Sequence, residues 1–326
     1  MTPRRHIAVS ITLLCGLLCA SLNCNRPSPT QTQPSSPPPT TQPASSATAL
    51  KDWVAHPSVD PAEKNVPAPR IVSAAPNVTE ICCALGLRDA LVGRTRYCDY
   101  PPGIESVTSI GALIDVNVEA LLELHPDLIL IAGTSRAQME RFTSLGLRVE
   151  SVPDFRVEDL FVAIRLIGDL TARPKTADTL CANIEADLDR VTQSHRDFHR
   201  RRILLCTAPL TDPPRPPLVA GPGSFYDDLL RRARLENIAP ETQMPFAPLS
   251  LEFIIRADPD VIIELAPDDA QRPHGDADAL QAWSNLGELK SVADHRVHVL
   301  IGNRYFLLGP RLPTTYEALC QSAATP

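Results

Sequence analysis

The sequence predicts an α/β protein of two lobes, each a parallel sheet covered by helices, with a long α-helix joining the lobes. Three observations support this prediction. Short apolar runs alternate with helical patterns from residue 70 onward, and a phrase of similar sequence occurs twice, 133 residues apart. The stretch between the two phrases has one apolar face at helical spacing.

The N-terminus predicts export. Arg4 and Arg5 precede an apolar run over 7–22, which has the order of a secretory signal and is short for a transmembrane helix. Cys24 then lies in a sequence that is similar to a lipoprotein processing site, where the cysteine becomes the lipidated first residue. Plain cleavage, which would leave Cys24 as an ordinary thiol, is the alternative. We expect a signal peptide over 1–24 and a periplasmic or cell-surface protein with a lipid anchor in a membrane.

Residues 25–69 are expected to form a disordered tether. Up to residue 49 they are almost entirely Ser, Thr, Pro, Gln and Ala, which bury too little apolar surface to offset chain entropy. The formal net charge of the whole chain is −7, and an acidic surface argues against nucleic acid as a partner.

The folded part is expected to contain an N-terminal lobe over 70–172, a bridging helix over 173–200 and a C-terminal lobe over 201–326. Strands are predicted at 70–74, 91–95, 128–132, 148–152, 202–207, 261–265 and 296–301, and helices at 79–85, 118–124 and 160–170. In the bridging helix the apolar residues recur at steps of three, four and seven. They are Ala177, Leu180, Cys181, Ile184, Leu188 and Val191.

The repeated phrase is the most informative feature. Residues 117–130 (NVEALLELHPDLIL) are echoed by 250–263 (SLEFIIRADPDVII), which aligns Glu119 with Glu252. In each copy a polar N-cap, Asn117 or Ser250, opens a short helix, and Pro-Asp ends it before the next strand. Two lobes with the same repeated phrase, joined by a long helix, predict a receptor that holds a ligand between the lobes. The long helix is expected to limit the movement of the lobes on binding.

Several segments resemble one known family. Residues 70–80 (RIVSAAPNVTE), 84–87 (ALGL) and 98–102 (CDYPP) resemble the first lobe of periplasmic binding proteins for vitamin B12, ferric siderophores and haem. Residues 303–311 (NRYFLLGPR) are similar to the last strand-to-helix turn of that family. The resemblance covers about 70–320 and implies two Rossmann-like lobes bridged by a helix, and no catalytic residues, metal site or cofactor.

The resemblance also implies partners. In the family, one glutamate on each lobe forms salt bridges with a dimeric ABC permease, and by matching phrase these are Glu119 and Glu252. A simpler interpretation is that each acid only complements a helix N-terminus. We expect a monomer that delivers its ligand to this permease dimer, with an ATPase driving import.

The ligand is expected to be a corrinoid. The stretch 97–102 (YCDYPP) looks most like the cobalamin-binding branch, in which a tyrosine at the position of Tyr97 lies against the corrin. Two departures from that branch leave ferric siderophore or haem open: no aromatic residue occurs in 111–115, and Asn303-Arg304 replaces Asp-Trp.

Further cleft residues follow from topology, because open α/β sheets bind ligands beyond the carboxyl ends of their strands. The residues at those ends are Pro76, Asn77, Tyr97, Thr134 to Arg136, Phe155, Arg156, Tyr305 and Phe306. Aromatic faces suit a large flat macrocycle, and an arginine suits its polar fringe.

The sequence gives less support to other classes of protein. The chain has no Gly-x-Ser-x-Gly, His-Glu-x-x-His or phosphate-loop motif, which argues against an exported hydrolase. His195 and His199 are spaced for a zinc or manganese receptor but lie in a charged segment that is expected to be solvated. A membrane-tethered sensor or scaffold that uses the same lobes without transport stays open.

Overall fold

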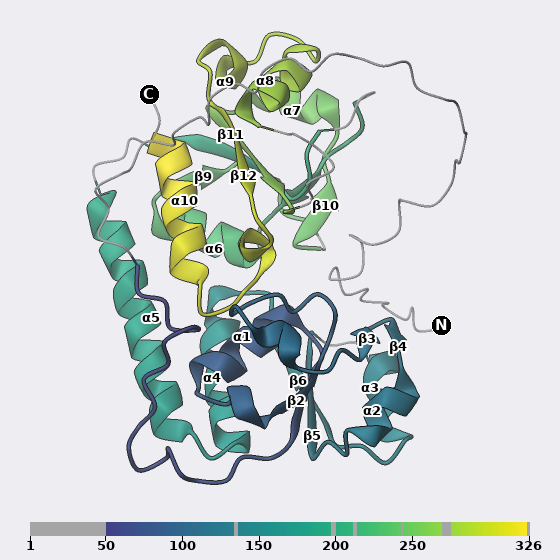
Figure 1. The fold of residues 1–326 in the computed structure, drawn as a ribbon. Helices are drawn as coiled ribbons and strands as arrows, with labels where there is room; N and C mark the ends of the chain where they lie inside the picture. The colour runs from purple at the N-terminus through teal and green to yellow at the C-terminus, as the bar shows by residue number, and fades with distance from the viewer. Residues whose placement is uncertain are drawn as a thin grey trace, which may run out of the picture.

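The computed structural model describes residues 50–133, 136–196, 200–210, 214–242, 244–268 and 275–324. The expected signal peptide, Cys24 and residues 25–49 of the expected tether lie outside these ranges, as do Thr134, Ser135 and His199. The described elements form two lobes, one above the other in Figure 1, with a long helix along one side of both.

The N-terminal lobe is built on a parallel sheet of four strands. The strand order is β2 (Leu91–Arg94), β1 (Ile71–Ser73), β5 (Leu128–Ala132) and β6 (Val149–Val152). Its helices are α1 (Pro76–Ala84), α2 (Val118–Glu123), α3 (Arg136–Thr143) and α4 (Val157–Leu170), with short turns η2 (Arg88–Ala90) and η3 (Ile104–Ser106). A hairpin of β3 (Gly111–Ala112) and β4 (Asp115–Val116) precedes α2. All four predicted strands are present, with ends shifted by one residue at most.

The C-terminal lobe has a mixed sheet. Strands β7 (Arg202–Cys206), β11 (Val261–Ala266) and β12 (Val297–Ile301) are parallel, as predicted, and β9 (Glu236–Asn237) also pairs parallel with β7. The sheet continues beyond β7 into β8 (Leu218–Ala220) and β10 (Phe246–Pro248), which were not predicted. Strand β8 runs antiparallel to both of its neighbours, β7 and β10. Strands β8 and β10 each have only three residues, LVA and FAP, in a proline-rich region, which is too short a run to be recognised as a strand from the sequence.

Helices and a short turn complete this lobe. They are α6 (Phe225–Arg232), α7 (Leu251–Ala257), α8 (Asp276–Ser284), α9 (Lys290–Ala293), η4 (Asn303–Phe306) and α10 (Leu312–Ala324). No helix within the described ranges is both long enough and apolar enough to cross a membrane.

The bridging helix is α5 (Pro174–Ser194), which has 21 residues and is therefore about 31 Å long. All six residues of its predicted apolar face are buried. The helix packs against α4 of the first lobe and α10 of the second (Figure 1). One hydrophobic core consequently runs from β1 and α1 through α5 to α6 and α10, so the lobes share buried side chains.

The two repeated phrases adopt the same local structure. The side chain of Asn117 accepts a hydrogen bond from the backbone N–H of Ala120 (3.0 Å), and that of Ser250 accepts one from Phe253 (3.2 Å). Both predicted N-caps are therefore confirmed, and both helices end before the Pro-Asp pair.

Residues 50–69 correct the boundary of the expected tether, because they belong to the folded part. The indole N–H of Trp53 donates to Asp187 on α5 (3.1 Å), and the Trp53 ring is buried. The carboxylate of Glu63 accepts hydrogen bonds from the backbone N–H groups of Lys175 (2.8 Å) and Thr176 (3.0 Å) at the start of α5. Figure 1 shows this segment, in purple, running beside α5. Its tryptophan and capping acid distinguish it from the Pro/Ser/Thr-rich stretch before it.

Candidate functional site

The carboxyl ends of the parallel strands of both sheets face the junction between the lobes. Asp99, beyond the end of β2, accepts a hydrogen bond from the side chain of Asn303, beyond the end of β12 (3.0 Å). Asn77, beyond the end of β1, donates to the backbone carbonyl of Leu308 (3.5 Å). This is the arrangement in which open α/β sheets bind ligands.

Tyr97 has the most exposed large side chain of the described hydrophobic residues, with 55% of its surface accessible. Its loop is nevertheless well anchored, since the neighbouring Cys98 is buried and its sulfur accepts a hydrogen bond from Thr79 (3.0 Å). Asp99, two residues after Tyr97, accepts a hydrogen bond from Asn303 of the other lobe. An anchored loop therefore holds an exposed aromatic ring beside the junction of the lobes.

Four other predicted residues lie at this junction but are less accessible. Asn77 and Tyr305 are buried, and Pro76 and Phe306 are half-buried. The backbone carbonyl of Tyr305 accepts a hydrogen bond from the hydroxyl of Tyr226 (2.6 Å). Asn77 thus bonds across the lobes, whereas the hydrogen bond of Tyr305 stays within the C-terminal lobe. The Tyr305 side chain belongs to the shared core, and Phe306 packs against that core.

Phe155 and Arg156 follow β6 and lie at the same edge of the sheet as the other predicted residues, whereas the Arg136 side chain extends into solvent. Phe155 is half-buried, and Arg156 forms an ion pair with Asp228 of α6, in the other lobe. Arg136 has a side chain that is 90% exposed and pairs with Glu140 on its own helix (2.7 Å). The structure does not bring Arg136 together with the other cleft residues.

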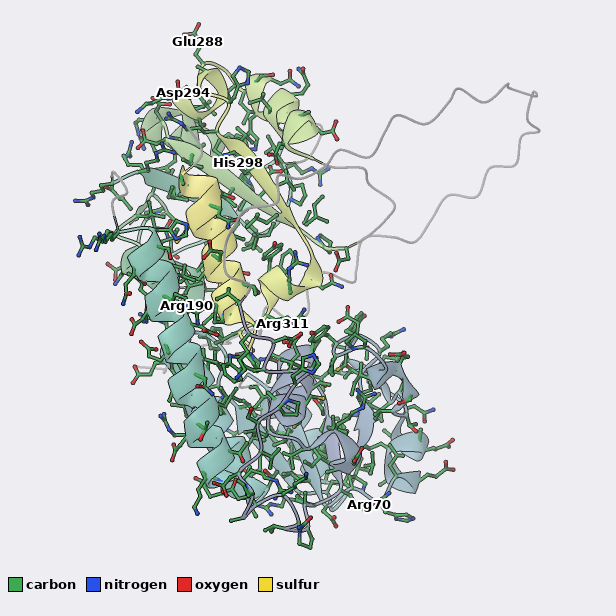
Figure 2. All side chains as sticks on the ribbon, turned by 60° about the vertical axis from the view of Figure 1, so that its left-hand side comes forward. Arg70, Arg190, Glu288, Asp294, His298 and Arg311 are labelled. Carbon is green, nitrogen blue, oxygen red and sulfur yellow. The ribbon has the colours of Figure 1, made fainter. Side chains whose placement is uncertain are left out.

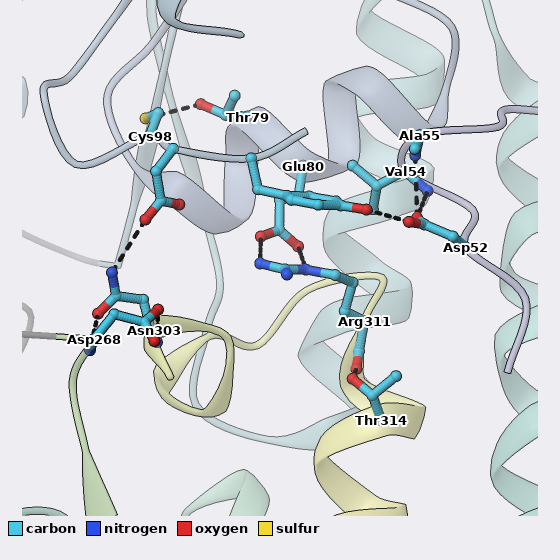
Figure 3. Close-up of polar contacts among 12 residues, drawn as sticks. Asp52, Val54, Ala55, Thr79, Glu80, Cys98, Asp268, Asn303, Arg311 and Thr314 are labelled. Carbon is cyan, nitrogen blue, oxygen red and sulfur yellow. Dashed lines mark hydrogen bonds and ion pairs between the residues drawn. The ribbon is translucent and has the colours of Figure 1, made fainter. Parts of the chain in front are cut away.

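Sequence reasoning missed an ion pair that joins the lobes. Arg311, just before α10, holds the carboxylate of Glu80 on α1 with both its Nε (3.1 Å) and its Nη2. Figure 3 shows this fork, and Figure 2 places Arg311 between the lobes. Burial raises the pKa of Glu80, and the guanidinium opposes that effect. In the sequence, Glu80 begins the otherwise apolar stretch 80–87. Because a glutamate is almost never fully buried unless it is paired, this position is the one feature of the sequence that indicates a partner.

Tyr100 and Asp52 extend this ion pair into a network. The Arg311 guanidinium lies 4.0 Å from the centre of the Tyr100 ring, a cation–π contact. The Tyr100 hydroxyl donates to the carboxylate of Asp52 in the N-terminal segment. Burial and the Asp52 carboxylate raise the pKa of Tyr100 to about 12, so the phenol stays a donor.

A cavity lies between α4 and α6, beside α5. Its volume is about 340 Å³, and it is lined by Arg156, Val157, Glu158, Asp228, Leu229 and Arg232. Arg156 pairs with Asp228, and Arg232 pairs with both Glu185 and Asp189 of α5 (2.6 Å each). Because the acids of the protein already pair both cations, the cavity is not set up to bind an anion.

Glu119 and Glu252 are exposed and occupy equivalent positions on α2 and α7. Neither forms an ion pair with another residue in the described ranges. In Figure 1, α2 and α7 belong to different lobes and lie in the right-hand half of the view, with α5 at the left. Both carboxylates are therefore available to a partner.

The histidines do not assemble a metal site in the described part of the chain, where no three His, Cys, Asp or Glu side chains gather as metal ligands. His195 lies at the end of α5, with its Nε2 3.7 Å from Glu317. Six cysteines, which include Cys82 and Cys83, are free thiols and buried.

Comparison with known proteins agrees with this geometry. The uncharacterized ABC transporter substrate-binding lipoprotein YvrC of Bacillus subtilis is 27% identical over 261 residues, 78% of this chain and 79% of that protein. The vitamin B12-binding protein of Salmonella paratyphi A is 25% identical over 198 residues, 60% and 72% of the two chains. The crystal structure of the periplasmic haem-binding protein HutB of Vibrio cholerae superposes with a TM-score of 0.68 at 21% identity, covering 79% and 99%, and shows the same fold.

The family model described as periplasmic binding protein matches residues 71–300, which include both sheets and the helix between them. The resemblance seen in the sequence is therefore confirmed, and the chain belongs to the periplasmic binding protein family.

Proposed function

We propose that this chain is the substrate-binding component of an ABC importer and that it holds a corrinoid between its two lobes. The observation that carries the choice of ligand is Tyr97, an exposed ring beside the junction of the lobes. An aromatic face of this kind binds a flat macrocycle by burying apolar surface. The vitamin B12-binding protein among the relatives supports the same choice.

The function needs no chemical step. The ligand enters between the lobes and lies against Tyr97, while Pro76, Phe155 and Phe306 supply further apolar surface at the strand ends. The loaded protein then docks Glu119 and Glu252 on a permease dimer, whose ATPase drives import. A lipid on Cys24 would keep the protein at the membrane, consistent with the lipoprotein among its relatives.

Two other functions remain as alternatives. A ferric siderophore or haem would use the same cleft, and a haem-binding protein shares the fold. A membrane-tethered sensor or scaffold would keep the cleft but would not need Glu119 and Glu252.

Isothermal titration of the chain without residues 1–49 tests the ligand. Cyanocobalamin, a dicyano-corrinoid, haemin and a ferric hydroxamate are compared at one salt concentration. We expect one-to-one binding of a corrinoid, a loss of about 10-fold in affinity for Tyr97→Ala, and little change for Tyr97→Phe, which keeps the ring.

The other outcomes separate the alternatives. Binding of haemin or of the hydroxamate alone would overturn the corrinoid proposal and leave the importer proposal in place. If none of the four chelates binds, the sensor or scaffold becomes the better interpretation.

A further inference from the structure

The duplication of the docking helices extends beyond the two glutamates. Leu122 on α2 and Ile255 on α7 are also 133 residues apart, and each follows its glutamate by three positions. Both side chains are large, apolar and 41% exposed. Each lobe therefore presents an acid and an exposed apolar side chain in the same relative positions.

Helix geometry places each pair on one outward side. Residues three apart on a helix are neighbours on its surface, so Leu122 lies beside Glu119, and Ile255 beside Glu252. The residues between them, Leu121 and Ile254, are fully buried and hold each helix on its lobe. The buried positions fix the rotation of the helices, and the acid and its apolar neighbour both face away from the core.

Exposed apolar residues that occur singly need no explanation, since much of any protein surface is apolar. Val162 on α4, which is 48% exposed, is such a residue. Leu122 and Ile255 differ because the second copy repeats both the exposure and the neighbouring acid. Surface positions that only face solvent have no physical reason to keep this combination in both lobes.

We propose that Leu122 and Ile255 are apolar anchors of the docking surface, each packing on the permease beside the basic side chain that pairs with Glu119 or Glu252. This inference rests on the proposed importer function. Two similar acid-plus-apolar patches on one chain fit a partner that presents the matching basic-plus-apolar patch twice, as a two-fold symmetric dimer does. The charges then steer and orient the encounter, and the anchors contribute affinity by excluding water.

Photo-crosslinking in cells of the source organism tests the anchors with the full-length chain. Benzoylphenylalanine is introduced at position 122 or 255, or at the exposed position 123 or 256, one turn after each glutamate, with position 162 as the control. We expect adducts from 122 and 255 that mass spectrometry identifies as an ABC permease subunit, and no adduct from 162. In a second arm, Leu122→Ser with Ile255→Ser should lower the adduct yield from position 123 at least 10-fold, whereas Val162→Ser should not.

The outcomes distinguish this inference from the function on which it rests. Permease adducts from 123 and 256 without any from 122 and 255, or an unchanged yield in the Leu122→Ser, Ile255→Ser variant, would overturn the proposed anchors and leave the proposed docking by Glu119 and Glu252 in place. The absence of permease adducts from all four positions would overturn both. A thermal melt of each variant checks that it folds like the wild type.

Discussion

The carboxylate of Glu80 and the guanidinium of Arg311 form a buried fork that joins the two lobes, with side-chain exposures of 2% and 19%. The pair lies where α1 of the first lobe meets the turn before α10 of the second. The backbone approaches closely here, since a Cβ on Gly309 would lie 3.3 Å from the Glu80 carboxylate. The contact therefore helps to set how the lobes sit relative to each other.

Arg311→Met should lower the free energy of unfolding by about 3 kcal/mol, because it leaves a buried carboxylate without its partner. Urea denaturation of the chain without residues 1–49 measures the change. Glu80→Gln combined with Arg311→Met should be less destabilised than Arg311→Met alone, since no buried charge is left unpaired. Arg136→Ala, which breaks the exposed pair with Glu140, is the control and should cost at most about 1 kcal/mol. Equal effects of Arg311→Met and Arg136→Ala would contradict the prediction.

Local patterns explain what could be predicted from the sequence. The apolar face of α5 and the N-caps Asn117 and Ser250 follow from the identities of residues close together in the chain. The Glu80–Arg311 pair could not be predicted, because its partners are 231 residues apart and only the fold brings them together. Tyr97 could be placed at a strand end, but its exposure depends on the buried anchors of its loop, which include Cys98.

The segment 50–69 should contribute to stability, because Trp53 is 6% exposed and bonded to Asp187 of α5. Trp53→Ala should cost about 3 kcal/mol through the cavity that it leaves. Trp53→Phe keeps most of the ring and loses the hydrogen bond, so it should cost about 1 kcal/mol. Urea denaturation followed by circular dichroism measures both variants. A Trp53→Ala variant as stable as the wild type would show that the segment is not part of the cooperative unit.

The six described thiols should be unreactive in the folded protein, although export would expose them to an oxidising compartment. Burial raises the pKa of Cys83 and of Cys320 to about 12 and that of Cys181 to about 11, and only the thiolate attacks an alkylating reagent. In the chain without residues 1–49, maleimide should label none of the six within an hour at pH 7, and all six in guanidinium chloride. Ser284→Cys, at an exposed position, provides the positive control. Fast labelling of a native cysteine would contradict the burial.

Asp154 should make stability depend on pH between about 4 and about 6. The residue lies beyond the end of β6, next to Phe155, and burial, with a smaller effect of the nearby Asp159 carboxylate, raises its pKa to about 6. A carboxyl group whose pKa is higher in the folded state than in the unfolded state binds its proton more tightly when folded. Its stabilising effect is therefore complete below the unfolded pKa of 3.8 and is lost as the pH rises through about 6.

Asp154→Asn removes the half-buried charge and should be more stable than the wild type at pH 7, by on the order of 2 kcal/mol. At pH 4 the wild-type carboxyl group is protonated in the folded state, so the two proteins should differ little. Urea denaturation at half-unit steps from pH 4 to pH 7.5 measures this difference, and Asp115→Asn, at an exposed position, controls for the general effect of removing one charge. A difference between Asp154→Asn and the wild type that stays constant across this range would show that Asp154 does not titrate there. A growing difference would identify the carboxyl end of β6, at the edge of the proposed cleft, as a place where an ionised side chain destabilises the folded protein.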